Sequence, residues 1–320
     1  MSYGERVISV CGELVADLIE QPDGMLRPVP GGSPANTALA CAHLGLDVDF
    51  LGRFGHDVFG ERAWDRLEAA GVRLSGSVRA AEPSTLAVAT TDEDGHAHYS
   101  FWTTGTADWQ WSASELAHAP VPGTRVVHAA SVASWTPPGA HAIGELLGRA
   151  RASRTMLVSY DPNIRPALLS ASSPDLVHRA IGYAHVVKVS DEDLLTLRPD
   201  ADPVDTARSW LDLGPDLVVV TTGARGAVAV RAGRDPVQVA APQVQVVDTI
   251  GAGDTFTAGL LYALSGLLAP DADPAGQLRD LDDEQVQQAL RTAAAAAAIT
   301  CTRAGCQPPD AAELAAALAE

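Results

Sequence analysis

The chain has 320 residues, 47% of them hydrophobic, which is enough apolar material for one large α/β core. Its formal net charge is −18, from 40 acidic and 22 basic residues, and this balance opposes nonspecific binding to nucleic acid or to an anionic membrane. No apolar run approaches the roughly 18 residues that a membrane-spanning helix needs, and no signal-peptide pattern precedes the strand-like segment 7–10. We therefore expect a cytoplasmic protein that binds small molecules and neither nucleic acid nor membrane.

The cysteines and the lysine are informative by their number. No cysteine spacing is typical of a metal site or a redox pair, and we interpret the four as small buried hydrophobic side chains; they are Cys11, Cys41, Cys301 and Cys306. Lys188 is the only lysine. Because every other basic side chain apart from histidine is arginine, we interpret Lys188 as a compact positive charge near bound phosphate, with an ordinary strand-end side chain as the alternative.

Apolar, β-branched segments alternate with helix-like segments along most of the chain. This alternation predicts an α/β fold with a mostly parallel sheet covered by helices on both faces, as a single domain over residues 1–320. The predicted strands are Val7–Cys11, Asp49–Gly52, Arg125–Ala129, Thr155–Tyr160, Val186–Val189 and Leu217–Thr221. The predicted helices are Pro34–Leu44, Gly60–Ala70, Pro138–Arg151, Pro174–Ala180, Asp191–Leu197, Pro203–Leu213, Gly253–Leu268, Asp283–Cys301 and Asp310–Ala319.

One region departs from this alternation. Thr85–Thr91 and His96–Thr103 have period-two patterns and are joined by an Asp-Glu-Asp-Gly sequence, which is typical of a β-hairpin. With Glu13–Ile19 this hairpin would form a small β lid, made from about 13–30 and 83–111. The aromatic residues of this region either pack the lid itself or cover a ligand or a dimer partner; they are Tyr99, Phe101, Trp102, Trp109 and Trp111.

The segment Asp248–Gly259 runs from a turn of small residues directly into a helix with an apolar face. Gly251 and Gly253 allow positive φ and a close approach of backbone N–H groups. The helix start adds free donors and the positive end of the helix dipole, so that this segment is suited to bind phosphate. Asp254 lies within the turn, where its charge would repel a phosphate unless the carboxylate takes part in the chemistry.

A second glycine-rich segment, Gly31–Asn36, also begins a helix. Its two glycines bring bare backbone close to a ligand, and Asn36 lies in the first helical turn. Asp17 follows the first predicted strand. Carboxylate, amide and backbone groups together can satisfy the several hydroxyls of a polyol, which both donate and accept hydrogen bonds.

The chain resembles the ribokinase-like (PfkB) carbohydrate kinases, with Gly31–Gly60 matching one family signature and Asp248–Leu260 the other. The resemblance covers essentially the whole chain and implies a three-layer α/β/α fold with a small β lid. Within the family the chain looks most similar to the fructokinases, through Gly12–Asp17, Gly31–Asn36 and Asp161–Arg165. The last of these segments is shared with 2-keto-3-deoxygluconate kinases.

The resemblance implies roles for the residues around the turn. Asp254 would be the base that takes the proton from the attacking sugar hydroxyl. The backbone N–H groups of Ala252 and Gly253, which follow Gly251, would stabilise the transferred phosphoryl group. The positions that match the sugar contacts of the family, besides Asp254, are Asp17, Gly31, Gly32 and Asn36.

Arg165 follows a predicted strand and an Asp-Pro-Asn turn, so we expect it to project from the carboxyl edge of the sheet, where ligands bind in open α/β sheets. Its guanidinium could hold the sugar or the transferred phosphoryl group through two hydrogen bonds. A surface arginine in a turn is the alternative.

The nucleotide side is implied by residues at the same edge. Lys188 ends a strand there, and Ser190 and Asp193 stand where the family commonly carries Asn and Glu near Mg²⁺ and phosphate. Capping of the next helix by Ser190 is the alternative. Thr222, Gly223 and Gly226 match the loop that passes the nucleotide in the family. This sequence would also suit a plain hairpin turn. The other positions that the resemblance implies for nucleotide binding are Gly251 and Gly253.

The family often binds a monovalent cation, usually K⁺, through carbonyl groups near the phosphate turn. The positions that match this cation site are Asp248, Ile250 and Gly305.

These features predict an ATP-dependent sugar kinase with Mg²⁺ as cofactor and K⁺ as an optional one, and most specifically a fructokinase that makes D-fructose 6-phosphate. A 2-keto-3-deoxygluconate kinase, a ribokinase or a nucleoside kinase remains open, as does a regulator that binds nucleotide and sugar without catalysis. A dehydrogenase is disfavoured because no G-x-G-x-x-G follows the first strand. The exposed aromatics expected on the lid suggest a homodimer formed through it.

Overall fold

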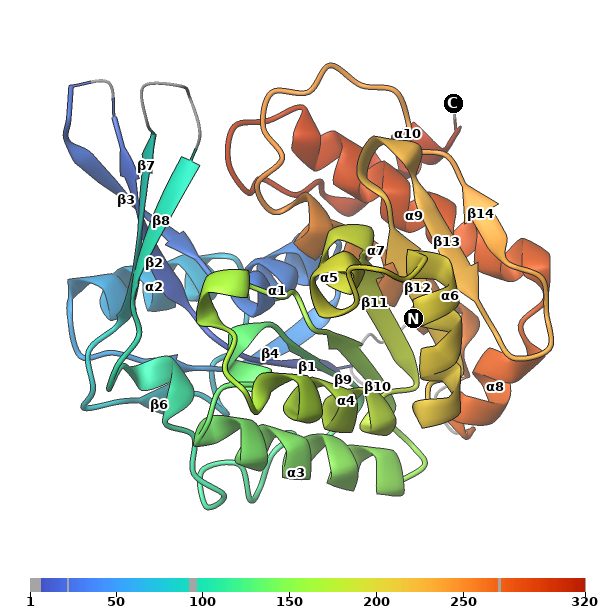
Figure 1. Cartoon of the computed structure of the whole chain (residues 1–320), viewed down its shortest axis with the longest axis horizontal. Coiled ribbons are helices and arrows are strands. Elements are labelled where there is room, and N and C mark those ends of the chain that lie inside the picture. Colours follow the sequence, from blue (N-terminus) through green and yellow to red (C-terminus); the bar gives the residue numbers. More distant parts are fainter. Residues whose placement is uncertain (1–6, 22, 92–96, 270–271, 320) are drawn as a thin grey trace.

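The computed structural model describes residues 7–21, 23–91, 97–269 and 272–319. An eight-stranded sheet forms the centre, in the order β14-β13-β12-β11-β10-β9-β1-β4 (Figure 1). Its strands from β4 to β12 run parallel, whereas β13 and β14 are antiparallel additions. The strands are β1 Val7–Cys11, β4 Asp47–Leu51, β9 Thr124–Ala130, β10 Leu157–Asp161, β11 Val186–Ser190, β12 Leu217–Thr221, β13 Ala227–Val230 and β14 Val237–Val239.

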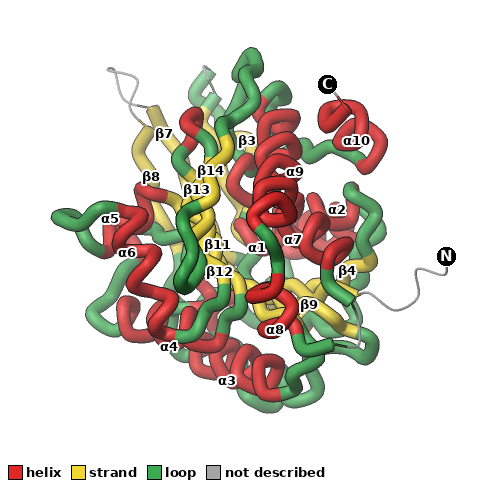
Figure 2. The backbone as a smooth tube through the Cα atoms, turned by 90° about the vertical axis from the view of Figure 1, so that its right-hand side faces the viewer, coloured by secondary structure: helices red, strands yellow, loops and turns green. Residues whose placement is uncertain are grey.

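Helices cover both faces of this main sheet (Figure 2). One layer contains α1 Ser33–His43, α7 Ala252–Leu267, α8 Pro274–Asp280 and α9 Asp283–Cys301. The other contains α3 Gly139–Ala152, α4 Ser173–Tyr183, α5 Asp191–Leu197 and α6 Pro203–Trp210. The remaining helices are α2 Val58–Ala69 and α10 Ala311–Ala319, and the short 3₁₀ helices are η1 Ala107–Trp109, η2 Val132–Ser134, η3 Pro166–Leu168, η4 Leu211–Leu213 and η5 Gly223–Arg225.

The apolar strands are buried on both faces because each layer of helices forms its own core with alternate residues of each strand. In β11, Val186 packs in the core with α7 and α9, whereas Val187 and Val189 pack in the core with α3 and α4. The prediction of a three-layer α/β/α fold with a mostly parallel central sheet is confirmed. No described helix has both the length and the apolar character needed to cross a bilayer.

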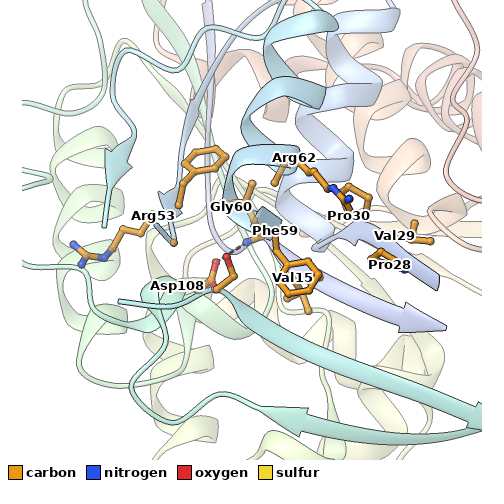
Figure 3. Close-up of a pocket in the computed structure, with 15 residues that line it drawn as sticks. Val15, Pro28, Val29, Pro30, Arg53, Phe59, Gly60, Arg62 and Asp108 are labelled. Carbon is orange, nitrogen blue, oxygen red and sulfur yellow. Dashed lines mark hydrogen bonds between the residues drawn. The ribbon is translucent and has the colours of Figure 1, made fainter. Parts of the chain in front are cut away.

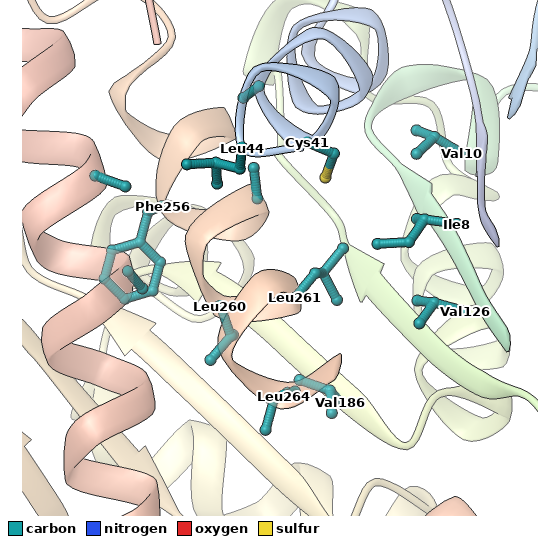
Figure 4. Packing of buried hydrophobic residues seen from close by; sticks show 14 of the residues in the cluster. Ile8, Val10, Cys41, Leu44, Val126, Val186, Phe256, Leu260, Leu261 and Leu264 are labelled. Carbon is teal, nitrogen blue, oxygen red and sulfur yellow. The ribbon is translucent and has the colours of Figure 1, made fainter. Parts of the chain in front are cut away.

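Helix α7 is held firmly in its layer. Phe256, Leu260, Leu261 and Leu264 form its buried face (Figure 4). On another side, a Cβ added at Gly259 would come within 2.9 Å of the backbone of α9 at Ala293, so the glycine leaves room for α9 to pack against α7. This packing fixes the position of the first turn of α7.

A second, four-stranded sheet stands away from the main sheet, at the upper left of Figure 1, and is called the small sheet below. Its order is β3-β2-β7-β8, with β2 Val15–Glu20, β3 Leu26–Gly31, β7 Thr85–Thr91 and β8 Ala97–Trp102. The predicted hairpin therefore forms, although its turn lies outside the described residues. A two-stranded sheet, β5 Arg53–Phe54 with β6 Val78–Arg79, lies near the base.

The aromatic residues expected on the lid fall into two groups. Trp109 and Trp111 are not on the small sheet: they are 3% and 2% exposed and pack in the core with α3, so their placement with the lid was wrong. Trp102 on β8 is 54% exposed. The cysteines are all free thiols, and only two of them, Cys11 and Cys41, are buried as expected.

Candidate active site

The turn before α7 has the geometry expected of an anion-binding site. Gly251 adopts the left-handed conformation with φ 77°, and a Cβ there would overlap the side chain of Cys306. The helix then begins at Ala252, and Thr255 makes a first backbone hydrogen bond to Gly251 O at 2.8 Å. Gly253 is exposed, whereas the Ala252 N–H donates to the Thr249 carbonyl at 3.2 Å.

Asp254, in the first turn of α7, is held by two side chains from the first turn of α1. Ser33 Oγ donates to Asp254 Oδ1 at 2.6 Å, and Asn36 Nδ2 donates to Oδ2 at 2.9 Å. Burial raises the pKa of Asp254, against the opposing effects of these hydrogen bonds and of Lys188. The structure thus joins the two glycine-rich segments through one carboxylate. Sequence analysis did not single out Ser33.

Lys188, on β11, forms a buried ion pair with Asp161 at the end of β10. Lys188 Nζ lies 2.9 Å from Asp161 Oδ2, and both side chains are nearly inaccessible. Burial alone would lower the pKa of Lys188, but the Asp161 carboxylate raises it and the net shift is upward. A Cβ added at Gly253 would lie 3.2 Å from Nζ, so the ammonium faces the turn before α7. Asp161 was not predicted as a site residue.

Three of the predicted sugar contacts lie where β3 ends and α1 begins. Asp17 on β2 lies against Gly31 at the end of β3, because its Oδ2 occupies the space where a Gly31 Cβ would be. Gly32 follows as the N-cap of α1, with φ 100°. Burial raises the pKa of Asp17 to about 6, and the Arg165 guanidinium opposes this shift.

Arg165 is exposed, and its own turn positions the guanidinium. Its Nη1 donates to Asn163 Oδ1 at 2.9 Å and to the Ile164 carbonyl at 3.1 Å. Arg165, which follows β10, is therefore near enough to Asp17 on β2 for its charge to act on the pKa of that carboxyl.

Ser190 and Asp193 form a capping box at the start of α5. Ser190 Oγ accepts from the Asp193 N–H at 3.0 Å, and Asp193 Oδ2 accepts from the Ser190 N–H at 3.3 Å. Asp193 Oδ1 also accepts from the Ile164 N–H at 2.9 Å and so fixes the turn that carries Arg165. The geometry therefore supports the capping alternative for Ser190.

The predicted nucleotide loop is a tight turn between the antiparallel strands β12 and β13. Thr222 N–H donates to the Gly226 carbonyl at 2.8 Å, and Gly226 needs its φ of 103°. Gly223 begins the short helix η5 within the turn. Thr221 pairs with Ser190, so this loop lies next to the end of β11 at the carboxyl edge.

The residues predicted for a monovalent cation are brought together. Asp248 Oδ1 accepts from the Ile250 N–H at 3.0 Å, and Oδ2 accepts from the Gly305 N–H at 2.8 Å. The Asp248 carboxylate therefore joins the segment before α7 to the loop after α9, next to the turn at Gly251.

Two buried carboxylates at the base of the small sheet were missed. Asp108 accepts from the Leu14 N–H at 2.7 Å and from Thr85 Oγ1, just where β2 and β7 begin. Glu13 accepts from the Ala133 N–H at 3.0 Å. Burial raises the pKa of Glu13 to about 7 and that of Asp108 to about 6.

A pocket lies between the small sheet and α2, with Asp108 in its lining (Figure 3). None of the predicted site residues lines it. Its lining comes from the start of β2, the end of β3 and the first half of α2, together with Asp108 and its surroundings; the labelled residues are Val15, Pro28, Val29, Pro30, Arg53, Phe59, Gly60, Arg62 and Asp108.

The fold and the site are together typical of an α/β phosphotransferase that acts on a hydroxyl group. A glycine turn, a helix N-terminus and a carboxylate held by Ser33 and Asn36 meet at the carboxyl edge of a parallel sheet. Residues 7–313 match the family described as pfkB family carbohydrate kinase. The chain belongs to this family.

Individual relatives agree with this assignment. A fructokinase from Rhizobium leguminosarum bv. trifolii is 34% identical over 266 residues, covering 81% of this chain and 79% of the relative. The crystal structure of a Xylella fastidiosa fructokinase with bound ATP is 30% identical with a TM-score of 0.88, covering 98% of both chains. A Vibrio cholerae fructokinase with fructose, ADP and calcium bound is 29% identical with a TM-score of 0.83, covering 99% of this chain and 100% of that one.

Proposed function

We propose that the protein is an ATP-dependent fructokinase that converts D-fructose to D-fructose 6-phosphate. The observation that carries this proposal is the position of Asp254, fixed by Ser33 and Asn36 at the N-terminus of α7. Two fructokinase structures from other organisms share the fold over nearly their whole length, and they contain ATP in one case and fructose with ADP in the other.

In the proposed reaction Asp254 takes the proton from the sugar hydroxyl as that oxygen attacks the γ-phosphorus of ATP. The new P–O bond forms to the sugar while the bond to the bridging oxygen of ADP breaks. Backbone N–H groups at Gly251, Ala252 and Gly253 would stabilise the transferred group, and the Lys188 ammonium beside Gly253 would offset its negative charge. For Ala252 this requires its N–H to leave the Thr249 carbonyl.

The sugar would lie between the small sheet, acting as a lid, and the main body. Asp17 supplies an acceptor, Gly31 and Gly32 supply close backbone, and Arg165 supplies donors from the opposite side. Asn36 adds a specific argument: its Oδ1 is buried and has no partner among the described residues, while its Nδ2 is committed to Asp254. A sugar hydroxyl that donates to this oxygen would satisfy it.

ATP would enter with Mg²⁺. Among the described residues no group of three or more His, Cys, Asp or Glu side chains could hold a metal ion, so the phosphates themselves would supply most ligands to Mg²⁺ besides water. Ser190, Asp193 and the Thr222–Gly226 loop line the edge where the nucleotide would lie. A K⁺ ion would be held by backbone carbonyls near Asp248, Ile250 and Gly305, and would support the turn.

The test is a coupled assay of ATP consumption over fructose, 2-keto-3-deoxygluconate, ribose and adenosine. We expect the highest kcat/KM for fructose. Strong turnover of another compound with negligible turnover of fructose would refute the substrate, and no turnover of any would favour a binding protein without catalysis. The second candidate function is that of a 2-keto-3-deoxygluconate kinase, because the exposed Arg165 guanidinium could pair with the carboxylate of that substrate.

We also propose a homodimer through the small sheet. In the strand register, Leu26 pairs with Glu20 and Trp102 with Leu86, which places both exposed side chains on the face opposite to Asp17. They are 45% and 54% exposed. Sedimentation of the wild type should show a dimer that Trp102→Glu weakens; a monomer at micromolar concentration would refute it.

A further inference from the structure

The Arg66 guanidinium on α2 joins two segments that lie on different sides of the site. Its Nη1 donates to the Pro30 carbonyl at 2.6 Å, and its Nη2 donates to the Cys306 carbonyl at 3.3 Å. Pro30 is part of β3 in the small sheet, whereas Cys306 lies in the loop after α9. Helix α2 and the end of β3 also lie side by side around the pocket of Figure 3.

The Pro30 contact acts on the sugar side. Pro30 immediately precedes Gly31, which packs against the Asp17 carboxylate, and Gly32, which leads into Ser33 and Asn36. The hydrogen bond from Arg66 therefore fixes the segment that carries most of the proposed sugar contacts.

The Cys306 contact acts on the phosphate side. The Cys306 side chain packs directly against Gly251, at the point where a Cβ would have to be. Gly251 is the N-cap of α7, three residues before Asp254. The neighbouring Gly305 donates to Asp248, so that the loop after α9 supports the turn at two points.

We propose that Arg66 is a positioning residue that couples sugar binding under the small sheet to nucleotide binding at the turn before α7. This inference rests on the proposed sugar kinase activity. When sugar orders β3, the Pro30 carbonyl holds one side of the guanidinium fork, and the other side orders the Cys306 carbonyl and with it Gly251. The second ligand then meets a turn that is already ordered and binds more tightly.

The planar fork of arginine is essential to this role, because it presents donors to two carbonyls at once. A lysine keeps the charge near the C-terminus of α2 but provides a single ammonium that cannot hold both carbonyls in this geometry. Arg66→Lys is therefore the sharpest variant, and Arg66→Met removes both charge and fork. Arg62→Met is the matched control, since Arg62 is an exposed arginine one turn earlier on the same helix.

The experiment measures by calorimetry the Kd of the sugar with and without a non-hydrolysable ATP analogue, and the Kd of the analogue with and without sugar. The sugar is the one that the wild type phosphorylates best. We expect the wild type to show coupling of about 5- to 150-fold. Arg66→Lys and Arg66→Met should reduce it to within about twofold of unity while each binary Kd changes less than the coupling does, and Arg62→Met should keep it.

The inference would be overturned if both Arg66 variants showed the same coupling between sugar and nucleotide binding as the wild type. It would also be overturned if the wild type showed no coupling. A purely structural role would lower the thermal stability of both variants without changing the coupling ratio, and this outcome also counts against it. Failure of the proposed function is a separate result, seen as the lack of turnover of any sugar by the wild type.

Discussion

The main sheet and the small sheet are enclosed to very different degrees. Every residue of β10 in the main sheet is buried, whereas in β2 of the small sheet Ala16 alone is buried and the other five residues are partly or fully exposed. The main sheet has a helical layer on each face, and the small sheet is attached mainly at its base (Figure 1). The proposed catalytic carboxylate therefore lies on a helix packed in the core, while Asp17 lies on a sheet that is attached to the main body mainly at its base.

This contrast suits a kinase. A phosphoryl transfer needs reacting groups in one geometry, which the packing of α7 against α1 and α9 supplies. Binding and release of a sugar need a cover that can move. Substitutions in the main body should thus change kcat, and substitutions at the base of the small sheet should change the KM for sugar.

The largest expected effect comes from Asp254→Asn. Without the base, kcat should fall about 10²- to 10⁴-fold, while the Kd values for sugar and ATP stay close to wild type. Steady-state kinetics and calorimetry on the same protein measure both. Asp212→Asn, an exposed change on η4, is the control. Turnover near that of the wild type would remove Asp254 from the mechanism.

A smaller effect, on the KM and on stability rather than on kcat, is expected from Asp108→Ala. This change leaves the Leu14 N–H and the Thr85 hydroxyl without their acceptor, so the base of the small sheet loosens. The free energy of unfolding should fall by about 2–3 kcal/mol, and the KM for sugar should rise about tenfold with kcat little changed. Asp108→Asn keeps an acceptor for Leu14 and should recover part of the KM. A fall in kcat with an unchanged KM would contradict the expectation that the base of the small sheet governs sugar binding.

The last effect concerns the stability of the protein and its dependence on pH, with no change in activity expected. Burial raises the pKa of Glu13 from 4.5 to about 7, so the folded protein binds this proton more tightly than the unfolded chain. The contribution of Glu13 to the free energy of unfolding therefore falls as the pH rises from about 4.5 to about 7, and is constant above. Relative to wild type, Glu13→Gln should gain on the order of 3 kcal/mol in the free energy of unfolding over this range.

Urea unfolding at a series of pH values measures this gain. Glu145→Gln, on the exposed side of α3, should show none. If the difference between Glu13→Gln and wild type does not change with pH, the carboxyl does not titrate in the folded protein as its burial requires.

The fold could be predicted because it follows from local patterns. Strands such as Val186–Ser190 carry β-branched residues buried on both faces, and helices alternate with them in sequence. Glycines also marked the candidate site directly: Gly32 and Gly251 adopt positive φ, and a Cβ at Gly31 would overlap the Asp17 carboxylate. Strands β13 and β14 were missed, since short antiparallel additions leave little periodicity.

The buried polar partners could not be predicted. Ser33, Asp161, Glu13 and Asp108 are recognisable only once distant segments meet: Ser33 bonds to a residue 221 positions away, and Asp161 to one 27 positions away. Trp109 and Trp111 were assigned by their proximity in sequence to the hairpin, but the chain leaves the small sheet before them and enters the main core. Tertiary contacts, not spacing, decide both cases.

The lone lysine has a practical consequence for labelling chemistry. Lys188 is the single side-chain amine in 320 residues, and it is buried in its ion pair with Asp161. An amine-directed reagent can therefore modify a side chain in this protein at one position alone, and only when that position opens. The extent of acylation at Lys188, followed by mass spectrometry as nucleotide or sugar is added, would report the opening of the phosphate edge without any engineered probe.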